Sequence, residues 1–297
     1  MSDSVPGREL AGRIERLIGA RVESYRRVAG GYTPATRLLC RTAGGSFFAK
    51  VGTTPLTCQF LNREIHVYQR LRGDFMPRLV ASEERETEPV LVIEDLSSRH
   101  WPPPWDERQV ELTLAQIKAL HETPASLETF AQAHGAMGGN WHAVAEDPGP
   151  FLSLGVADAL WLEAALPSLI EFEEGCSTAG DSLAHLDLRS DNICLAAGRA
   201  VFVDWNHACL SNSRLDLGFW LPSLAYESGI EPEKILPDAP EVAAFVSGFF
   251  AARAGLPLIC DAPRVRAVQR RQLATALPWV ARALGLPPLP AGDRLKE

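Results

Sequence analysis

Three side chains whose oxygen atoms could bind a metal ion or accept a proton stand close together between residues 183 and 208. They are Asp187, Asn192 and Asp204. Carboxylate and amide oxygens suit hard metal cations, and a carboxylate can also orient or accept the proton of a hydroxyl group. The sequence therefore indicates a site at which metal binding and proton handling occur together.

The residues that follow Asp187 are expected to form a β-hairpin. Val201–Val203 is an apolar run typical of a buried strand, and Gly198 supplies a turn before it. A hairpin returns the chain on itself, so Asn192 and Asp204 at its open ends would come close together. Asp187 would lie just upstream on an irregular loop.

A lysine and a glutamate further upstream are candidates for an ion pair. Lys50 interrupts the apolar strand predicted over 46–51, and Glu64 lies one turn from apolar residues of the helix predicted over 58–71. An inward-facing carboxylate normally needs a partner. We therefore predict a Lys50–Glu64 pair; in the alternative, Lys50 extends to solvent and Glu64 is a solvated surface residue.

The order and spacing of these residues resemble those of the protein-kinase-like phosphotransferases, most closely the aminoglycoside phosphotransferase and choline kinase branch. The residues that carry the resemblance are His185, Asp187, Asn192 and Asp204, the last followed by an aromatic residue. The resemblance implies an α+β, bilobal protein-kinase-like fold. Residues 1–96 would form a small antiparallel-sheet, nucleotide-binding lobe, and residues 97–297 a mainly helical lobe with the catalytic loop and the substrate site.

The resemblance also implies roles for these residues in ATP- and Mg²⁺-dependent chemistry. Lys50 would hold the ATP phosphates, and Glu64 would hold Lys50. Asp187 would orient the attacking hydroxyl group or accept its proton. Asn192 and Asp204 would bind Mg²⁺.

Two other positions in the catalytic loop leave questions open. Arg189 could meet the transferring phosphoryl group; equally, it could face solvent or pair with Asp191. Leu186 departs from the resembled branch, which usually has glycine at this position. His185 is expected to support the loop backbone instead of transferring protons.

Two further segments are candidates for nucleotide binding. Gly30 and Gly31 lie in a turn between predicted strands, where their N–H groups could approach a phosphate and Thr33 could add a hydroxyl. Taken alone, paired glycines favour an ordinary hairpin turn, and the position ahead of Lys50 favours the phosphate loop. The resemblance implies that backbone groups at Glu94 and Leu96, after the last strand, bind the adenine edge.

The second lobe is expected to be helical, with one long insert. Apolar periodicity predicts helices over 107–121, 156–172, 231–255 and 264–284. Residues 123–150 are expected to form an irregular insert that either lines the substrate site or is a structural excursion. His121 is expected to be structural. Asp216 would brace the catalytic loop, as the resemblance implies, or cap a helix N-terminus.

The composition restricts the function classes. The chain has 297 residues, of which 46% are hydrophobic and 22% charged, as expected for a soluble protein with two lobes. A net charge of −8 argues against a nucleic-acid binder and is compatible with a cationic substrate. Six scattered cysteines signal neither a zinc site nor disulfides. With neither a signal peptide nor a membrane span in the sequence, we expect a cytoplasmic protein without membrane partners.

The predicted function is phosphoryl transfer from ATP to a hydroxyl group of a small molecule, by a monomer or weak dimer. An aminoglycoside or similar cationic antibiotic is the leading substrate class, ahead of choline, a sugar or an amino alcohol. A nucleotide-binding pseudokinase is the less favoured alternative. Four acidic residues could form a cation pocket or an ordinary helix surface: Glu227, Glu231, Glu233 and Glu241.

Overall fold

The structure, a computed structural model, describes residues 6–135 and 137–290. Its internal contacts divide the chain into two units, each built from separate stretches of sequence. The first extends to Pro102 and adds Asp106–Leu120 and Asp191–Ala208. The second comprises Pro103–Trp105, His121–Ser190 and the chain from Cys209 onward.

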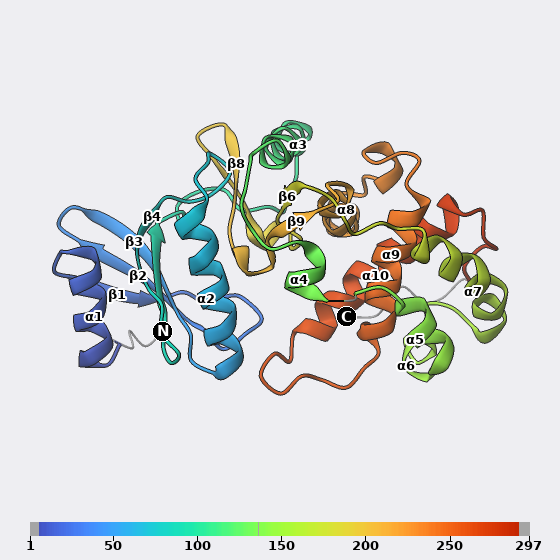
Figure 1. The fold of residues 1–297 in the computed structure, drawn as a ribbon, viewed down its shortest axis with the longest axis horizontal. Helices are drawn as coiled ribbons and strands as arrows, with labels where there is room; N and C mark the ends of the chain where they lie inside the picture. Colours follow the sequence, from blue (N-terminus) through green and yellow to red (C-terminus); the bar gives the residue numbers. More distant parts are fainter. Residues whose placement is uncertain (1–5, 136, 291–297) are drawn as a thin grey trace. The chain divides into compact units, whose positions relative to one another are not determined.

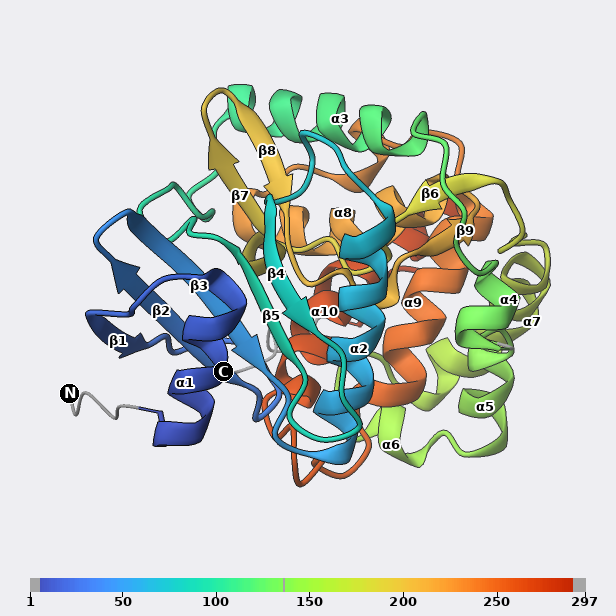
Figure 2. The same ribbon diagram turned by 60° about the vertical axis from the view of Figure 1, so that its left-hand side comes forward.

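A five-stranded antiparallel sheet forms the centre of the first unit, with the strand order β1-β2-β3-β5-β4. Helices α1 (Arg8–Ile18) and α2 (Pro55–Arg70) lie on its opposite faces (Figures 1 and 2). These elements confirm the predicted antiparallel sheet. The strands are β1 (Ser24–Arg27), β2 (Thr36–Thr42), β3 (Gly45–Val51), β4 (Leu79–Glu83) and β5 (Val90–Glu94).

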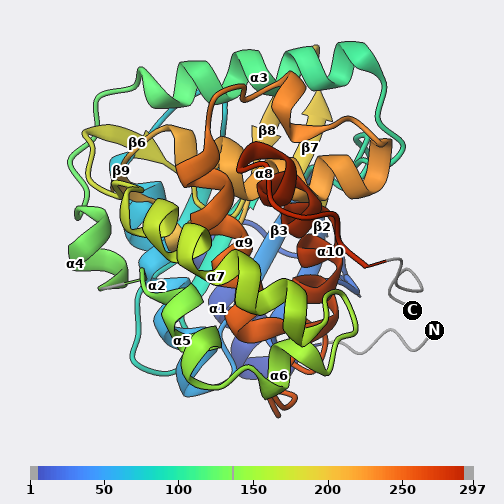
Figure 3. The same cartoon turned by 90° about the vertical axis from the view of Figure 1, so that its right-hand side faces the viewer.

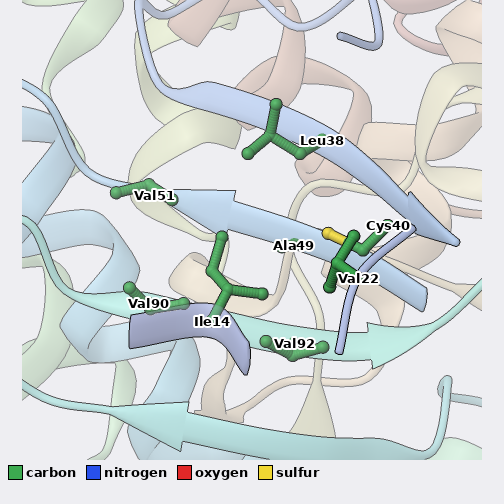
Figure 4. Packing of buried hydrophobic residues seen from close by; sticks show 8 residues of the cluster. All are labelled: Ile14, Val22, Leu38, Cys40, Ala49, Val51, Val90 and Val92. Carbon is green, nitrogen blue, oxygen red and sulfur yellow. The ribbon is translucent and has the colours of Figure 1, made fainter. Parts of the chain in front are cut away.

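One face of this sheet is apolar and packs against α1 (Figure 4). Successive side chains of a strand point to opposite faces, so alternate residues of β2, β3 and β5 reach this core. The intervening residues, Arg37 and Lys50 among them, lie on the face toward α2. The core cluster contains Ile14, Val22, Leu38, Cys40, Ala49, Val51, Val90 and Val92.

The predicted hairpin is confirmed and belongs to the first unit. Strands β7 (Ile193–Ala196) and β8 (Arg199–Phe202) pair antiparallel, with Ile193 opposite Phe202. Ala197 and Gly198 both have positive φ angles, 51° and 78°, as the tight two-residue turn requires.

Two sets of contacts attach this hairpin to the rest of the first unit. The N–H of Phe202 donates to the carbonyl of Phe75 at 2.7 Å, and the N–H of Leu195 donates to that of His100 at 2.8 Å. The hairpin also shares a buried cluster with the segment after β5. That cluster contains Leu96, Cys194, Ala196 and Val201, with Trp101 and Val203 packed against it.

The second unit is mainly helical. Helix α9 (Pro240–Ala254) contacts α5, α7, α8 and α10 and lies at its centre (Figure 3). A small pair of strands, β6 (Ser182–Ala184) and β9 (Cys209–Ser211), lies on either side of residues 185–208 in the sequence. Helix α3 (Glu107–His121) belongs to the first unit up to Leu120, and its last residue, His121, belongs to the second unit. The other helices are α4 (Phe130–His134), α5 (Asn140–Glu146), α6 (Gly149–Leu152), α7 (Ala159–Glu174), α8 (Arg214–Ser228) and α10 (Val265–Ala283).

The prediction of a single helix over 231–255 is wrong. The segment contains a short 3₁₀ turn, Pro232–Lys234, and α9 begins only at Pro240. A residue that precedes proline is disfavoured in helical conformation, and Asp238 has a positive φ of 50°. The chain therefore cannot continue as one helix through this region.

The prediction that 123–150 is irregular is also wrong, because the segment contains α4, α5 and the start of α6. The side chain of Thr129 accepts from the N–H of Gln132 and caps α4. At the start of α5, the buried carboxylate of Glu173 accepts from the N–H groups of Asn140, at 3.0 Å, and Trp141, at 2.8 Å. The insert is thus held to the helical body.

Replacing Glu173 by alanine is expected to lower the free energy of unfolding by about 3 kcal/mol, because the backbone N–H groups of Asn140 and Trp141 and the side-chain Nδ2 of Asn140 all lose their buried acceptor. Urea denaturation measures the change. Glu174→Ala is the matched control: its side chain is 64% exposed and pairs with His142 at the surface, so a change within about 0.5 kcal/mol is expected. Equal effects in the two variants would contradict the assigned role.

Candidate active site

Lys50 lies at the centre of a charged cluster in the first unit. Its Nζ donates to Oε2 of Glu64 on α2 at 2.7 Å and also to Oδ1 of Asp204. The predicted Lys50–Glu64 pair is therefore confirmed. The side chains of Lys50 and Glu64 are nearly enclosed, at 13% and 3% exposed, whereas that of Asp204 is 32% exposed and remains accessible.

The carboxylates around Lys50 control its charge. Burial would lower the pKa of the Lys50 ammonium group, but Asp204 and Glu64 outweigh this effect and raise the pKa. Lys50 is therefore charged at neutral pH. Burial raises the pKa of the Glu64 carboxyl group, against the opposing effects of Lys50 and of a hydrogen bond from the N–H of Trp205. Glu64 thus joins Lys50 to the segment that carries Asp204.

Trp205 fixes the position of Asp204. Its side chain is fully buried, its ring lies 5.6 Å from that of Phe75, and its Nε1 donates to the carbonyl of Phe202 at 2.8 Å. The 3₁₀ turn Trp205–His207 packs against α2. Asp204 itself has a φ of 71° and so turns out of the strand direction of β8.

Asn192 and Asp204 lie at the two open ends of the hairpin, as predicted. Asn192 is 4% exposed, and its carbonyl accepts from the N–H of Val203 at 3.0 Å. Their side chains offer one amide and one carboxylate oxygen, a donor set that fits Mg²⁺ with phosphate oxygens and water as its other ligands. Both belong to the same unit as Lys50.

Phe48 is a residue that the sequence analysis missed. It lies two residues before Lys50 on β3 and so shares the same sheet face, where it is half-buried opposite Leu39 of β2. An aromatic ring on the face that carries Lys50 offers a flat apolar surface for a nucleotide base. The two-residue spacing from Lys50 was the available signal.

The segment after β5 is held by its own hydrogen bonds. The N–H of Glu94 donates to the carbonyl of Arg78 at 3.0 Å, and the carbonyl of Leu96 accepts from Nε1 of Trp101 at 3.1 Å. Between them, Asp95 accepts from the hydroxyl of Ser46 at 2.5 Å. Burial would raise the pKa of Asp95, but the donors Ser46 and Ser97 outweigh it and lower the pKa.

Asp216 organises the loop that carries Asp187 in the second unit. Its fully buried carboxylate accepts from the N–H groups of His185, at 2.9 Å, and Leu186, at 2.6 Å, and lies 3.0 Å from Nε2 of His121. The predicted brace is confirmed, as is the structural role of His121. The helix-cap alternative is wrong, since Ser213 is the N-cap of α8.

Arg189 has a partner that the sequence analysis did not predict. Its Nη1 pairs with Oδ1 of Asp187, and the two side chains are 16% and 23% exposed. The N–H of Asp187 donates to Nδ1 of His185 at 3.3 Å, as expected if His185 supports the loop. The loop therefore presents a carboxylate with a cation beside it.

Comparison with solved structures identifies the fold. Aminoglycoside phosphotransferase APH(4)-Ia is similar with a TM-score of 0.58 and 15% identity, over 92% of this chain and 96% of that one. Choline kinase LicA from Streptococcus pneumoniae gives 0.57 and 13%, over 93% and 96%. This chain has their protein-kinase-like fold. Spectinomycin phosphotransferase APH(9)-Ia gives 0.52 and 14%, over 95% and 89%.

No protein-family model and no curated protein matches the chain. In the described part of this kinase-like fold, no helix is long and apolar enough to cross a bilayer.

Glu227 contacts the loop that carries Asp187. Its two carboxylate oxygens accept from the hydroxyl of Ser190 at 2.6 Å and from Nε1 of Trp105 at 2.7 Å. Ser190 follows Asp187 by three residues. Glu227 therefore holds the loop after Asp187, whereas Asp216 holds it just before Asp187. Trp105 and Ser190 lie 122 and 37 residues from Glu227, too far for a local pattern to reveal the contact.

The other acidic residues considered for a cation pocket have partners within the second unit. Glu233 pairs with Arg282 at 2.7 Å, and Glu241 pairs with Arg214. Glu231 lies 3.8 Å from Nζ of Lys234. These pairs support the alternative, in which the acidic residues form an ordinary helix surface.

Leu186 occupies a backbone conformation that favours glycine, with a φ of 60°. Such a conformation costs a non-glycine residue about 1–2 kcal/mol, and glycine loses about 0.5–1 kcal/mol through its greater freedom when unfolded. Leu186→Gly is therefore expected to leave the free energy of unfolding unchanged or raise it by up to about 1 kcal/mol. Chemical denaturation tests this.

Leu188→Gly is the control, because Leu188 is fully buried in the same loop. It is expected to lose about 3 kcal/mol through the cavity that it leaves. A comparable loss in Leu186→Gly would show that the leucine side chain, and not the backbone angle, determines the stability of the loop.

Proposed function

We propose that this chain is an ATP- and Mg²⁺-dependent phosphotransferase that acts on a hydroxyl group of a small molecule. The Lys50–Glu64–Asp204 cluster supports this most strongly, since it joins a buried cation to the accessible carboxylate of Asp204 in one unit. The similarity to phosphotransferases solved with ADP or AMP-PNP adds to it.

The nucleotide would be held mainly by the first unit. Lys50 would bind the phosphates, assisted by the N–H groups of Gly30 and Gly31 and the hydroxyl of Thr33. The adenine edge would bind the carbonyl of Glu94 and the N–H of Leu96, since the Leu96 carbonyl already accepts from Trp101. Phe48 would contact the face of the base. This assignment makes residues 1–96 the nucleotide-binding lobe and gives residues 97–297 the catalytic loop, with its proposed metal ligands, and the substrate site.

Asp187 would carry the catalytic step. It would orient the acceptor hydroxyl and take its proton as the oxygen attacks the γ-phosphorus of ATP, and the bond from that phosphorus to the β–γ bridging oxygen would break to release ADP. Arg189, paired with Asp187, would stabilise negative charge on the transferring group. Asn192 and Asp204 would hold Mg²⁺, which would neutralise charge on the phosphates.

The acceptor is proposed to be an aminoglycoside or a similar cationic antibiotic. The net charge of −8 suits a cationic substrate, and the neighbours include complexes with hygromycin B and spectinomycin. Choline, a sugar or an amino alcohol is the alternative, supported by the similarity to choline kinase. We propose that the protein is cytoplasmic, because cytoplasmic ATP would be its phosphate donor. We also propose that it is a monomer or a weak dimer.

An acceptor panel tests the proposal. Purified protein is incubated with Mg²⁺, ATP and one compound each from the aminoglycosides, aminocyclitols, choline, amino alcohols and neutral sugars, and mass spectrometry measures phosphorylated acceptor. Phosphorylation of an amine-bearing alcohol is expected. If nucleotide binds but no compound in a broad panel is phosphorylated, the pseudokinase alternative replaces the enzyme.

A further inference from the structure

Arg37 of β2 carries a positive charge that the roles above do not use. In the β2–β3 register it lies directly opposite Lys50. Residues directly opposite in an antiparallel pair share one face of the sheet, with Cβ atoms about 5 Å apart. The face that carries Lys50 therefore has a second cation beside it.

The side chain of Arg37 is held against the glycine turn. Its Nη1 donates to the carbonyls of Ala35, at 3.0 Å, and Thr33, at 3.3 Å. Gly31 has a φ of 69°, and a Cβ added there would overlap the guanidinium group of Arg37. The backbone angle favours glycine at this position, and any larger residue would displace the guanidinium group of Arg37.

The charge of Arg37 is not balanced by a carboxylate. Among residues 6–135 and 137–290, its recorded hydrogen bonds go to neutral carbonyls and it forms no ion pair, whereas Lys50 pairs with two carboxylates. A guanidinium group has five N–H donors, and Nη1 alone makes both recorded contacts. A half-buried, pre-positioned guanidinium group suits an anion, and its planar fork matches phosphate oxygens.

We propose that Arg37 is a second phosphate-binding residue, which links the glycine turn to Lys50 and binds the nucleotide phosphates. The inference rests on the proposed function and adds to it a residue that the spacing of the catalytic motif does not include. A phosphate-binding role also gives a reason for the position of the Arg37 guanidinium group against the turn at Gly31.

Calorimetric titration of Mg²⁺·AMP-PNP and of adenosine into the full chain tests the inference. The variants are Arg37→Met, which removes the charge; Arg37→Lys, which keeps the charge and loses the fork; and Arg41→Met as the control. Arg41 lies four residues further along β2, on the same face, and is exposed. Melting curves without nucleotide show whether each variant is folded.

Arg37→Met is expected to raise the Kd for AMP-PNP by roughly 10- to 100-fold, as for loss of hydrogen bonds to a charged group, and to change the Kd for adenosine less than about twofold. Arg37→Lys should fall between, and Arg41→Met should match the wild type. An unchanged AMP-PNP affinity in Arg37→Met, or a parallel loss for both ligands, would overturn the inference while leaving the proposed function intact. If the wild-type chain binds neither ligand, the proposed function itself is wrong, and the inference falls with it.

Discussion

Replacing Asp187 by alanine is expected to lower kcat for phosphoryl transfer by roughly 10²- to 10⁴-fold, the range for loss of a positioned proton acceptor. The Kd for AMP-PNP should change less than about twofold, because Lys50 and the glycine turn, the main groups assigned to the phosphates, belong to the first unit and Asp187 belongs to the second. Steady-state kinetics with the acceptor found in the panel, together with calorimetric titration, measure both quantities.

Two companion variants make this result interpretable. Asp187→Asn keeps the shape of the side chain and a hydrogen-bonding oxygen for Arg189 but is a poor proton acceptor, so a similar loss of kcat is expected. Asp181→Asn removes an exposed carboxylate just before β6 and should have wild-type kcat. Wild-type kcat in Asp187→Ala would remove its assigned role.

Replacing Asp216 by alanine is expected to lower the free energy of unfolding by about 3–5 kcal/mol. The change leaves the buried N–H groups of His185 and Leu186 without their acceptor and removes the partner of His121. Urea denaturation measures the loss. Because the same N–H groups hold the loop that carries Asp187, kcat should fall as well.

Ser213→Ala separates this account from a simple helix-cap effect. Ser213 is the N-cap of α8 but makes no side-chain cap hydrogen bond, so its replacement should cost less than about 0.5 kcal/mol. Asp216→Asn, which retains one acceptor oxygen, should lie between the alanine variant and the wild type. A loss below about 1 kcal/mol in Asp216→Ala would show that the brace does not stabilise the loop.

Local sequence patterns predicted the contacts in the site that follow from the geometry of one hairpin or one helix. A short apolar run and one glycine predicted the hairpin that brings Asn192 and Asp204 together. The helical position of Glu64 predicted its contact with Lys50, because an inward carboxylate on α2 needs a cation. In both cases the geometry of a single strand or helix was sufficient.

Contacts between distant residues left no such pattern. Asp216 and His121 are 95 residues apart, and the position of His121 in its helix predicted burial but not its acceptor. Glu173 accepts a hydrogen bond from the first N–H group of α5, 33 residues away in the sequence. This contact stabilises a short helix where local periodicity indicated none.

The first unit is proposed to bind a metal–nucleotide complex through Lys50, Asn192 and Asp204. The most direct test is calorimetric titration of AMP-PNP with and without Mg²⁺, using wild type and Asp204→Ala. We predict that Mg²⁺ lowers the wild-type Kd by tenfold or more, roughly the effect of one charge-assisted contact, and has little effect in Asp204→Ala. A wild-type chain that binds no AMP-PNP, or an equal Mg²⁺ effect in the variant, would contradict the account.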